Sequence, residues 1–297
     1  MKLLVTGRAG QLARSLAQRA VDHADVELRF AARPEVDLAK PGSLAAAIGS
    51  ERPDVVVNAA AYTAVDEAEN EPRLAQRINA DAAGEAAAAA AEVGAAIIQI
   101  STDYVFDGNR DRPYREDDRV QPLGVYGRTK LTGEEQVRAA NPRHAILRTA
   151  WLYSPFGRNF VQSMMTAARS RPVLTVVDDQ RGSPTSALDL ADAVLVLAGR
   201  WSSGGRPAGG ATYHVAGSGV TSWCGLADAV MVECRTLGLP AAEVRPIATE
   251  DWPTRAERPR YSALDSGSFA AEIGVVLPDW RVSVRSVVRQ LAREVAA

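Results

Sequence analysis

The chain has 297 residues, of which 46% are hydrophobic and 24% are charged, and its formal net charge is −2. These values are typical of a globular protein that forms one large domain, or a large domain with a smaller one attached. No basic stripe runs along the sequence, which argues against a nucleic-acid partner. No apolar run approaches the ~20 residues of a membrane span.

The cysteines and the first residues bear on the compartment. Cys224 and Cys234 stand ten residues apart in a chain with three histidines, which is not the spacing of a zinc site. We expect both to be thiols in a reducing compartment. Only three apolar residues follow Lys2, too few for the apolar region of a signal peptide. We therefore expect a cytoplasmic protein.

Short apolar runs alternate with helical patterns in the first half of the chain. The runs are rich in Val, Ile and Leu and do not alternate with polar residues, as in parallel strands covered on both faces. Expected strands are 3–6, 26–31, 55–60, 97–101 and 146–150, and expected helices between them are 11–21, 72–93 and 123–140. This order predicts an α/β fold with a Rossmann-type doubly wound parallel sheet over residues 1–150.

The pattern changes after residue 150. We expect helices at 159–168, 187–198 and 223–237, short strands at 174–177 and 212–215, and a glycine-rich surface loop at 204–210. The segment 246–259 is rich in proline, charge and turn residues. We interpret residues 151–297 as mainly a smaller C-terminal substrate-binding lobe, with elements from about 174–217 returning to the main sheet.

Two glycines follow the first expected strand, in the segment Thr6-Gly7-Arg8-Ala9-Gly10-Gln11-Leu12-Ala13. Glycine there permits a tight turn and lets backbone N–H groups approach a pyrophosphate. The start of the next helix favours negative charge. We therefore expect Gly7, Gly10, Gln11 and Leu12 to bind a dinucleotide.

The next two strands supply the rest of the predicted cofactor site. The second strand is not followed by an acidic residue that would hold the ribose, and Arg33 could instead meet a 2′-phosphate, which favours NADPH over NADH. Arg33 as a solvated loop charge is nearly as good an interpretation. We expect the remaining contacts from Asp37 and Leu38, and from the small residues after the third strand, namely Ala59, Ala60, Ala61 and Thr63.

A tyrosine and a lysine stand four residues apart in Tyr126-Gly127-Arg128-Thr129-Lys130. In a helix the two side chains lie on one face. Reduction of a ketone needs a proton on oxygen, and a nearby lysine cation lowers the pKa of a tyrosine, which is about 10 when free. The same lysine can hold the ribose hydroxyls of a nicotinamide cofactor. We therefore expect Tyr126 and Lys130 to be both catalytic and cofactor-binding.

A hydroxyl pair ends the fourth expected strand. Thr102 is our candidate for holding the substrate carbonyl, and Ser101 is the near alternative. The carboxyl ends of parallel strands form the edge at which such sheets bind ligands.

These residues resemble the extended short-chain dehydrogenase/reductase family, and within it the reductases of dTDP-linked 4-keto-6-deoxy sugars. The resemblance covers most of the chain, in the blocks 6–12, 58–66, 101–108, 122–130, 148–151, 179–185 and 258–264. It implies reduction of the substrate at C4, with dTDP-4-dehydro-L-rhamnose as the first candidate. It also implies that Tyr126 is the proton donor, that Lys130 is its partner and that Thr102 holds the carbonyl. Trp151 would line the sugar pocket, although core packing explains it equally well. The other substrate-binding residues that we expect are Ser101, Asp103, Tyr104, Tyr126 and Asn159.

Two sequence differences from relatives narrow the expected reaction and the expected cofactors. Sugar-nucleotide dehydratases of the superfamily carry Thr-Asp-Glu after the fourth strand, whereas Tyr104 follows Thr102-Asp103 here. Without that glutamate, elimination of water is disfavoured and reduction is preferred. Some relatives bind Mg²⁺ at a dimer contact through acidic residues, but Ser15 and Leu188 stand at those positions, so we expect no metal.

Some alternatives stay open at this stage. The resemblance allows NADPH or NADH as the cofactor, another deoxysugar nucleotide as the substrate, and a homodimer as the assembly. A non-catalytic NADP-binding regulatory subunit of the same family is a further alternative. The Thr102, Tyr126 and Lys130 set argues against it, because a binding module does not need that set. One fold hosts many chemistries, so the fold alone does not choose between them.

Overall fold

The computed structural model describes residues 1–202 and 210–296. The glycine-rich loop expected at 204–210 lies outside the described residues except for Gly210.

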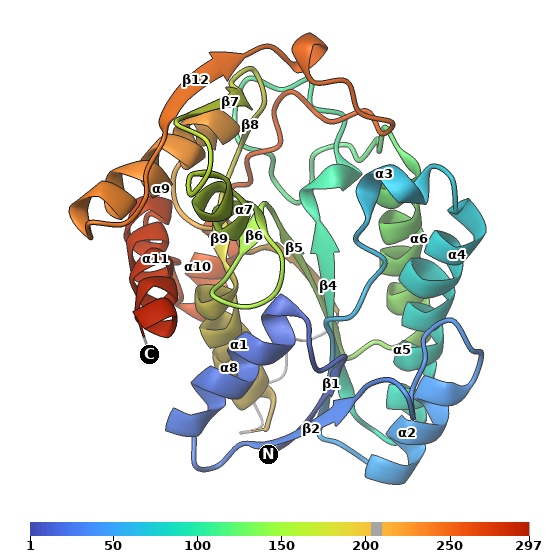
Figure 1. The fold of residues 1–297 in the computed structure, drawn as a ribbon. Helices are drawn as coiled ribbons and strands as arrows, with labels where there is room; N and C mark the ends of the chain where they lie inside the picture. Colours follow the sequence, from blue (N-terminus) through green and yellow to red (C-terminus); the bar gives the residue numbers. More distant parts are fainter. Residues whose placement is uncertain (203–209, 297) are drawn as a thin grey trace.

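A six-stranded parallel sheet forms the centre of the molecule (Figure 1). In spatial order its strands are β10 (Ala211–His214), β5 (His144–Thr149), β4 (Ala96–Thr102), β3 (Val55–Asn58), β1 (Lys2–Thr6) and β2 (Glu27–Ala31). The chain runs outward from β1 to β2 and then returns to β3 on the other side of β1. The carboxyl ends of β1 and β3 therefore flank the switch point at which such sheets bind ligands. The expected doubly wound α/β fold class is confirmed.

Helices cover both faces of the sheet (Figure 1). Side chains alternate between the faces of a strand, so Leu3 and Val5 join the core beneath one helical layer and Leu4 joins the core beneath the other. The first layer contains α1 (Gln11–Arg19), α8 (Ala187–Ser202) and α10 (Gly267–Ile273). The second contains α2 (Ser43–Glu51), α5 (Ala82–Glu92) and α6 (Val125–Ala140).

The helix expected at 72–93 forms as three pieces: α4 (Pro72–Gln76), a π-helical turn at Arg77–Asp81 and α5. Asn79 lies in the π turn, and its amide hydrogen-bonds the backbone N–H and C=O of Tyr62, at 2.8 and 3.1 Å. The amide also donates to Thr129 on α6 at 3.1 Å. Such turns often occur at functional sites, and this one fixes the chain after β3 to α6.

A second, smaller core lies beyond the carboxyl edge of β5. Its larger elements are α7 (Phe160–Ala167), α9 (Trp223–Thr236), α11 (Trp280–Ala296) and the parallel pair β7 (Val173–Val177) and β12 (Glu243–Ile247). Of the elements at 174–217 that were expected to return to the main sheet, β10 extends it and α8 covers it, but β7 does not, because it pairs with β12 instead. The short elements are α3 (Val65–Ala68), β6 (Leu152–Tyr153), β8 (Arg181–Gly182), β9 (Thr185–Ser186), β11 (Thr221–Ser222) and the 3-10 turns Ala20–Asp22, Asp103–Val105 and Thr249–Asp251.

Candidate active site

The loop between β1 and α1 has the geometry of a phosphate-binding turn. Gly7 has a φ of +79°, in the left-handed region that favours glycine, and its N–H donates to the carbonyl of Ala31 at 2.7 Å. Gly10 precedes α1, and within the described chain no side chain caps this helix and no acidic residue stands in its first turn. A Cβ on Gly10 would meet open space. The first N–H groups of α1 are therefore left for an anion, which fits the pyrophosphate of a dinucleotide.

The side chains predicted around this loop differ in what they can offer. Gln11 is tied to the 152–154 segment, since its amide donates to the carbonyl of Leu152 at 3.3 Å and accepts from Ser154 Oγ at 2.9 Å. Leu12 is buried in the core. Neither side chain is therefore free for a ligand, and each residue has only its backbone to offer.

The outer part of the predicted cofactor site lies after β2 and β3. Arg33 is exposed, and Asp37 and Leu38 are half-buried. The Asp37 carboxylate accepts from the N–H of Ala39 at 3.0 Å. After β3, the three alanines 59–61 are half-buried and Thr63 is exposed. The structure thus places Arg33 close after β2, Asp37 and Leu38 further along the same loop, and the small alanines directly after β3.

A chain of buried hydrogen bonds crosses the ends of β1, β3 and β4. The N–H of Ala60 donates to Thr6 Oγ1 at 2.9 Å, and Thr6 donates to Asn58 Oδ1 at 2.8 Å. The Asn58 amide donates to Gln99 Oε1 at 2.7 Å, and the Gln99 amide donates to the carbonyl of Ile100 at 3.0 Å. Satisfied buried networks of this kind fix their members. The chain links the alanine loop after β3 to the carbonyl that also receives Lys130.

Tyr126 and Lys130 lie on one face of α6, near its start. The Glu69 carboxylate accepts the N–H of Val125 at 2.7 Å and so satisfies a free donor at the start of this helix. Lys130 is 3% exposed, and its Nζ donates to the carbonyl of Ile100 at 2.6 Å. The half-buried Tyr126 ring meets the Tyr104 ring edge-on, with 5.7 Å between centroids. Contacts from three directions therefore hold the pair in place.

Burial shifts the pKa of both groups. It raises the pKa of Tyr126 to about 12, although a hydrogen bond with Thr102 lowers it in part. It lowers the pKa of Lys130 to about 8, and the negative charge of Glu134 opposes that shift. At neutral pH the phenol is therefore protonated and the lysine is a cation, which is the state that a proton donor beside a cationic partner requires.

Ser101 and Thr102 end β4 next to this pair, Asp103 begins the 3-10 turn that follows, and the three side chains have different partners. The Thr102 hydroxyl accepts the N–H of Tyr104 and donates to Asp103 Oδ1, both at 3.1 Å. Burial raises the pKa of Asp103 to about 7, although hydrogen bonds from Ser262 and Thr102 oppose this. Ser101 donates instead to Glu134 at 2.6 Å. Of the two hydroxyls, Thr102 is therefore the one beside the Tyr126 phenol.

The structure places the other predicted substrate residues further out. Trp151 has a φ of +46° and stacks on Trp223, with ring centroids 3.6 Å apart. It is half-buried, so it both packs and presents surface. Asn159 caps α7, accepting from the N–H of Gln162 at 3.1 Å, and its amide donates to the carbonyl of Ser154 at 2.8 Å. Its side chain thus has partners within its own loop.

An ion pair that the sequence analysis did not assign joins distant segments above the site. Arg258 binds Asp66 through two hydrogen bonds, at 2.7 and 3.1 Å, and the N–H of Ala256 donates to the same carboxylate at 3.0 Å. The Arg258 guanidinium also reaches Tyr104. Both ends of the pair lie in blocks of the resemblance, but nothing local in the sequence couples positions 192 residues apart.

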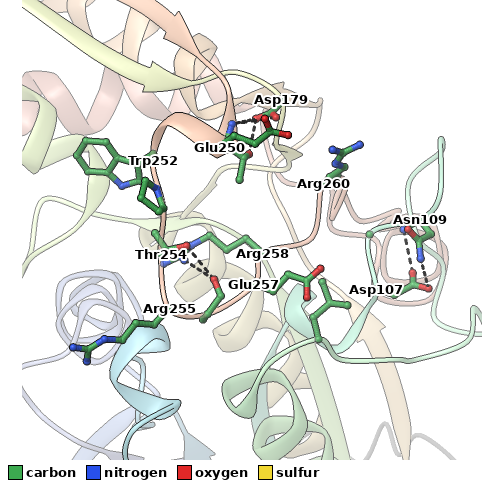
Figure 2. A pocket seen from close by; sticks show the side chains of 15 residues that line it. Asp107, Asn109, Asp179, Glu250, Trp252, Thr254, Arg255, Glu257, Arg258 and Arg260 are labelled. Carbon is green, nitrogen blue, oxygen red and sulfur yellow. Dashed lines mark hydrogen bonds between the residues drawn. The ribbon is translucent and has the colours of Figure 1, made fainter.

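A cavity of about 570 Å³ lies between the 249–260 segment, which includes Arg258, and Leu123. Figure 2 shows Trp252 and Arg255 on one side of it and Asp107 with Asn109 on the other. The exposed Trp252 indole offers a flat apolar surface on which a nucleotide base could stack, and the lining is mixed in charge, with three arginines and four acidic residues.

The described part of the chain contains no cluster of three or more His, Cys, Asp or Glu residues that could hold a metal ion. Ser15 and Leu188 are both buried. None of the described helices has the length and apolar composition needed to cross a membrane. Cys224 and Cys234 are free thiols.

Comparison with known proteins gives the family. The family model of the RmlD substrate binding domain matches residues 1–293. A dTDP-4-dehydrorhamnose reductase of Sinorhizobium fredii is 43% identical over 294 residues, 99% of each chain. The Escherichia coli dTDP-4-dehydrorhamnose reductase is 40% identical over 98% of each chain. The chain belongs to the dTDP-4-dehydrorhamnose reductase family.

Solved structures agree with this assignment. A dTDP-4-dehydrorhamnose reductase from Clostridium acetobutylicum superposes with a TM-score of 0.90 and 38% identity, covering 98% of this chain and 100% of that one. One from Bacillus anthracis, solved in complex with NADP, gives a TM-score of 0.89 with 31% identity over 97% and 99% of the two chains. These two reductases therefore share the overall architecture of this chain.

Proposed function

We propose that this chain reduces the C4 ketone of a dTDP-4-keto-6-deoxy sugar with NADPH or NADH, and that its substrate is dTDP-4-dehydro-L-rhamnose, giving dTDP-L-rhamnose. The observation that carries the proposal is the arrangement of Tyr126 and Lys130 beside Thr102 at the carboxyl edge of the sheet. Membership in the reductase family over nearly the whole chain supports it.

The cofactor-binding part of the proposal assigns the dinucleotide to the turn between β1 and α1. Gly7 and the free N–H groups at the start of α1 would hold the pyrophosphate, the alanines after β3 would lie against the dinucleotide, and Lys130 would hold the nicotinamide ribose hydroxyls. When bound, the reduced nicotinamide supplies the hydride that the carbonyl carbon receives.

The residues of the chain supply the proton and the orientation. Thr102 donates to the substrate oxygen and directs it toward Tyr126, whose phenol gives its proton to that oxygen as the C4–H bond forms. Lys130 stabilises the resulting tyrosinate, which regains a proton from solvent after release of the alcohol. Asp103 and Trp151 would flank the sugar ring. Tyr104 stands where a dehydratase carries its acid/base glutamate, so elimination of water would lack that group.

The later part of the chain would bind the rest of the substrate. We place the nucleotide recognition mainly in residues 151–297, with the Rossmann domain in residues 1–150, because the cavity beside Trp252 and Arg258 lies at their junction. We also propose a cytoplasmic location, the free thiols of Cys224 and Cys234 being in keeping with a reducing compartment. The homodimer stays a prediction.

A direct assay tests the proposal. The purified protein is incubated with dTDP-4-dehydro-L-rhamnose and NADPH or NADH, cofactor oxidation is followed by absorbance, and the product is identified by NMR. Formation of dTDP-L-rhamnose supports the proposal. Turnover only with another 4-keto sugar would assign a different deoxysugar, and cofactor binding without turnover of any 4-keto sugar would favour the non-catalytic alternative.

A further inference from the structure

A buried carboxylate lies one helical turn beyond Lys130. Glu134 on α6 has a fully buried side chain and accepts from Ser101 Oγ on β4 at 2.6 Å. Arg148 on β5 binds it through two hydrogen bonds, at 2.9 and 2.8 Å, and Arg138 donates at 2.9 Å. Since residues four apart are neighbours on a helix, Tyr126, Lys130 and Glu134 form one continuous face of α6.

Without Glu134, the buried cations Lys130 and Arg148 would lack a compensating negative charge. Lys130 and Arg148 are each 3% exposed, and a buried cation is costly unless an opposite charge compensates for it. Lys130 donates to a neutral carbonyl, that of Ile100, so its hydrogen bond brings no negative charge. Glu134 supplies that charge from inside the core.

Other titratable groups also face this cluster. Asp103, on the 3-10 turn after β4, acts on Tyr126, and burial keeps the pKa of Asp103 raised. On β10, His214 interacts with Arg148, Glu134 and Glu116, and burial lowers its pKa to about 4, so it is neutral near pH 7. Arg148 holds the pKa of Glu134 below its usual range against the effect of burial, so Glu134 is the permanent anion nearest to Lys130 along this face.

We propose that Glu134 is a positioning residue of the reductase centre, whose charge keeps Lys130 a cation while Arg148 and Ser101 hold the carboxylate in place. This role presupposes the proposed function, because Lys130 needs its charge in order to assist Tyr126 and to hold the cofactor ribose. It adds a fourth member, one turn further along α6, to Thr102, Tyr126 and Lys130.

The direction in which two substitutions shift the pKa of Lys130 separates this role from a purely structural one. Glu134→Gln keeps the size and the acceptor of the side chain but leaves Arg148 uncompensated, so Lys130 should lose its proton at lower pH. Arg148→Met leaves Glu134 less compensated, so Lys130 should lose its proton at higher pH. Both variants remove the same ion pair and should destabilise the fold alike. A structural role would therefore shift the pKa of Lys130 in the same direction in both variants.

The composition of the chain makes this measurable. It has three lysines, Lys2, Lys40 and Lys130, and Lys130 is the buried one. In protein labelled with [ε-¹³C]lysine, three NMR signals can be followed against pH, with Lys2→Arg and Lys40→Arg assigning the other two. We expect the Lys130 midpoint to fall by about one pH unit or more in Glu134→Gln and to rise in Arg148→Met.

The double variant Glu134→Gln with Arg148→Met should return the midpoint close to that of the parent, and Glu134→Asp, which keeps the charge, should also stay close to it. Shifts of the same sign in the two single variants, or no shift in either, overturn the proposal. If Glu134→Gln does not fold, the Arg148→Met shift and its cancellation in the double variant decide the question, and a missing shift again overturns it.

The titration uses the ligand-free enzyme, so it does not depend on the substrate. Absence of turnover by the parent would defeat the proposed function and leave the lysine signals readable. An active parent without the opposite shifts would defeat only the role of Glu134. As a second readout, the alkaline limb of kcat/KM should move in the same direction as the Lys130 midpoint in each active variant.

Discussion

Gly127 lies directly against the backbone of Tyr104: a Cβ added to Gly127 would be 2.2 Å from the Tyr104 carbonyl oxygen. Gly127 stands between Tyr126 and Lys130 in the chain, so this contact seats the catalytic face of α6 on the turn that follows β4. The oxygen belongs to the backbone and cannot turn aside. A side chain at position 127 must therefore push α6 away from Thr102.

Replacing Gly127 by alanine should cost both stability and activity. We expect a loss of about 1–3 kcal/mol in the free energy of unfolding from overpacking. We also expect kcat to fall by about tenfold or more, since displacements near 1 Å can cost up to ~10²-fold. Thermal unfolding and steady-state kinetics measure the two effects. Gly49→Ala, at an exposed position of α2 with open space around the Cβ, is the control and should stabilise by about 0.5–1 kcal/mol.

Tyr126→Phe should remove the proton donor and leave the rest of the site intact. We expect kcat to fall by about 10²–10⁴-fold, the usual contribution of a positioned acid, while NADPH affinity changes little. Kinetics and fluorescence titration with NADPH check the two parts. Tyr104→Phe, in the ring that meets Tyr126 edge-on, removes a neighbouring hydroxyl without removing the proton donor, and should lower kcat far less than Tyr126→Phe. Retention of full activity by Tyr126→Phe would disprove the assigned proton donor.

The pH dependence of reduction should follow Lys130. Burial lowers its pKa to about 8, so the cation is present at neutral pH and is lost as the pH rises through that value. Burial raises the pKa of Tyr126 to about 12, so the phenol keeps its proton over the same range. We therefore expect kcat/KM to be level near neutral pH and to decline above about pH 8. A profile that stays level up to about pH 10, where a free lysine titrates, would contradict this.

The Asp66–Arg258 pair should control substrate affinity more than the chemical step. It ties the 249–260 segment, which lines the cavity, to the segment after β3. Asp66→Asn should loosen that segment and raise KM for the sugar nucleotide about tenfold, with a smaller effect on kcat. The exposed pair Arg255–Glu67 joins the same segments, and Glu67→Gln, which does not alter the cavity lining, should change KM less than about twofold. Equal effects of the two variants on KM would show that the Asp66–Arg258 pair has no special role in substrate affinity.

The parts of the fold and the site that follow local rules could be predicted from the sequence. Unbroken apolar strands predicted the parallel sheet, and the spacing of Tyr126 and Lys130 placed both on one helix face. The same spacing extends to Glu134 and could have indicated it. The π turn around Asn79 could not be predicted, because contacts with Tyr62 and Thr129 from other elements produce it rather than its own sequence.

Long-range pairing explains the other omissions. Asp66 and Arg258 are separated by most of the chain, and no periodicity in one sequence couples them. Trp223 belongs to a helix that was predicted correctly, but its stacking on Trp151 depends on how the second core folds over β6. Ser101 and Thr102 are adjacent hydroxyls of one strand end. Only the position of Glu134 on the facing helix shows that Ser101 has a buried partner.

Arg33 decides the last prediction, which concerns the choice of cofactor. It is exposed after β2, in the position from which a guanidinium can pair with a 2′-phosphate through charge-assisted hydrogen bonds. Arg33→Ser should raise KM for NADPH by about tenfold, the loss expected from one exposed charge-assisted contact of ~1.5 kcal/mol, and should leave KM for NADH almost unchanged. Steady-state kinetics with both cofactors measure this, and Arg29→Ser, earlier on β2 and paired with Glu27, controls for loss of charge alone. A parent enzyme that prefers NADH, or an Arg33→Ser variant with an unchanged KM for NADPH, would mean that Arg33 is a solvated surface charge.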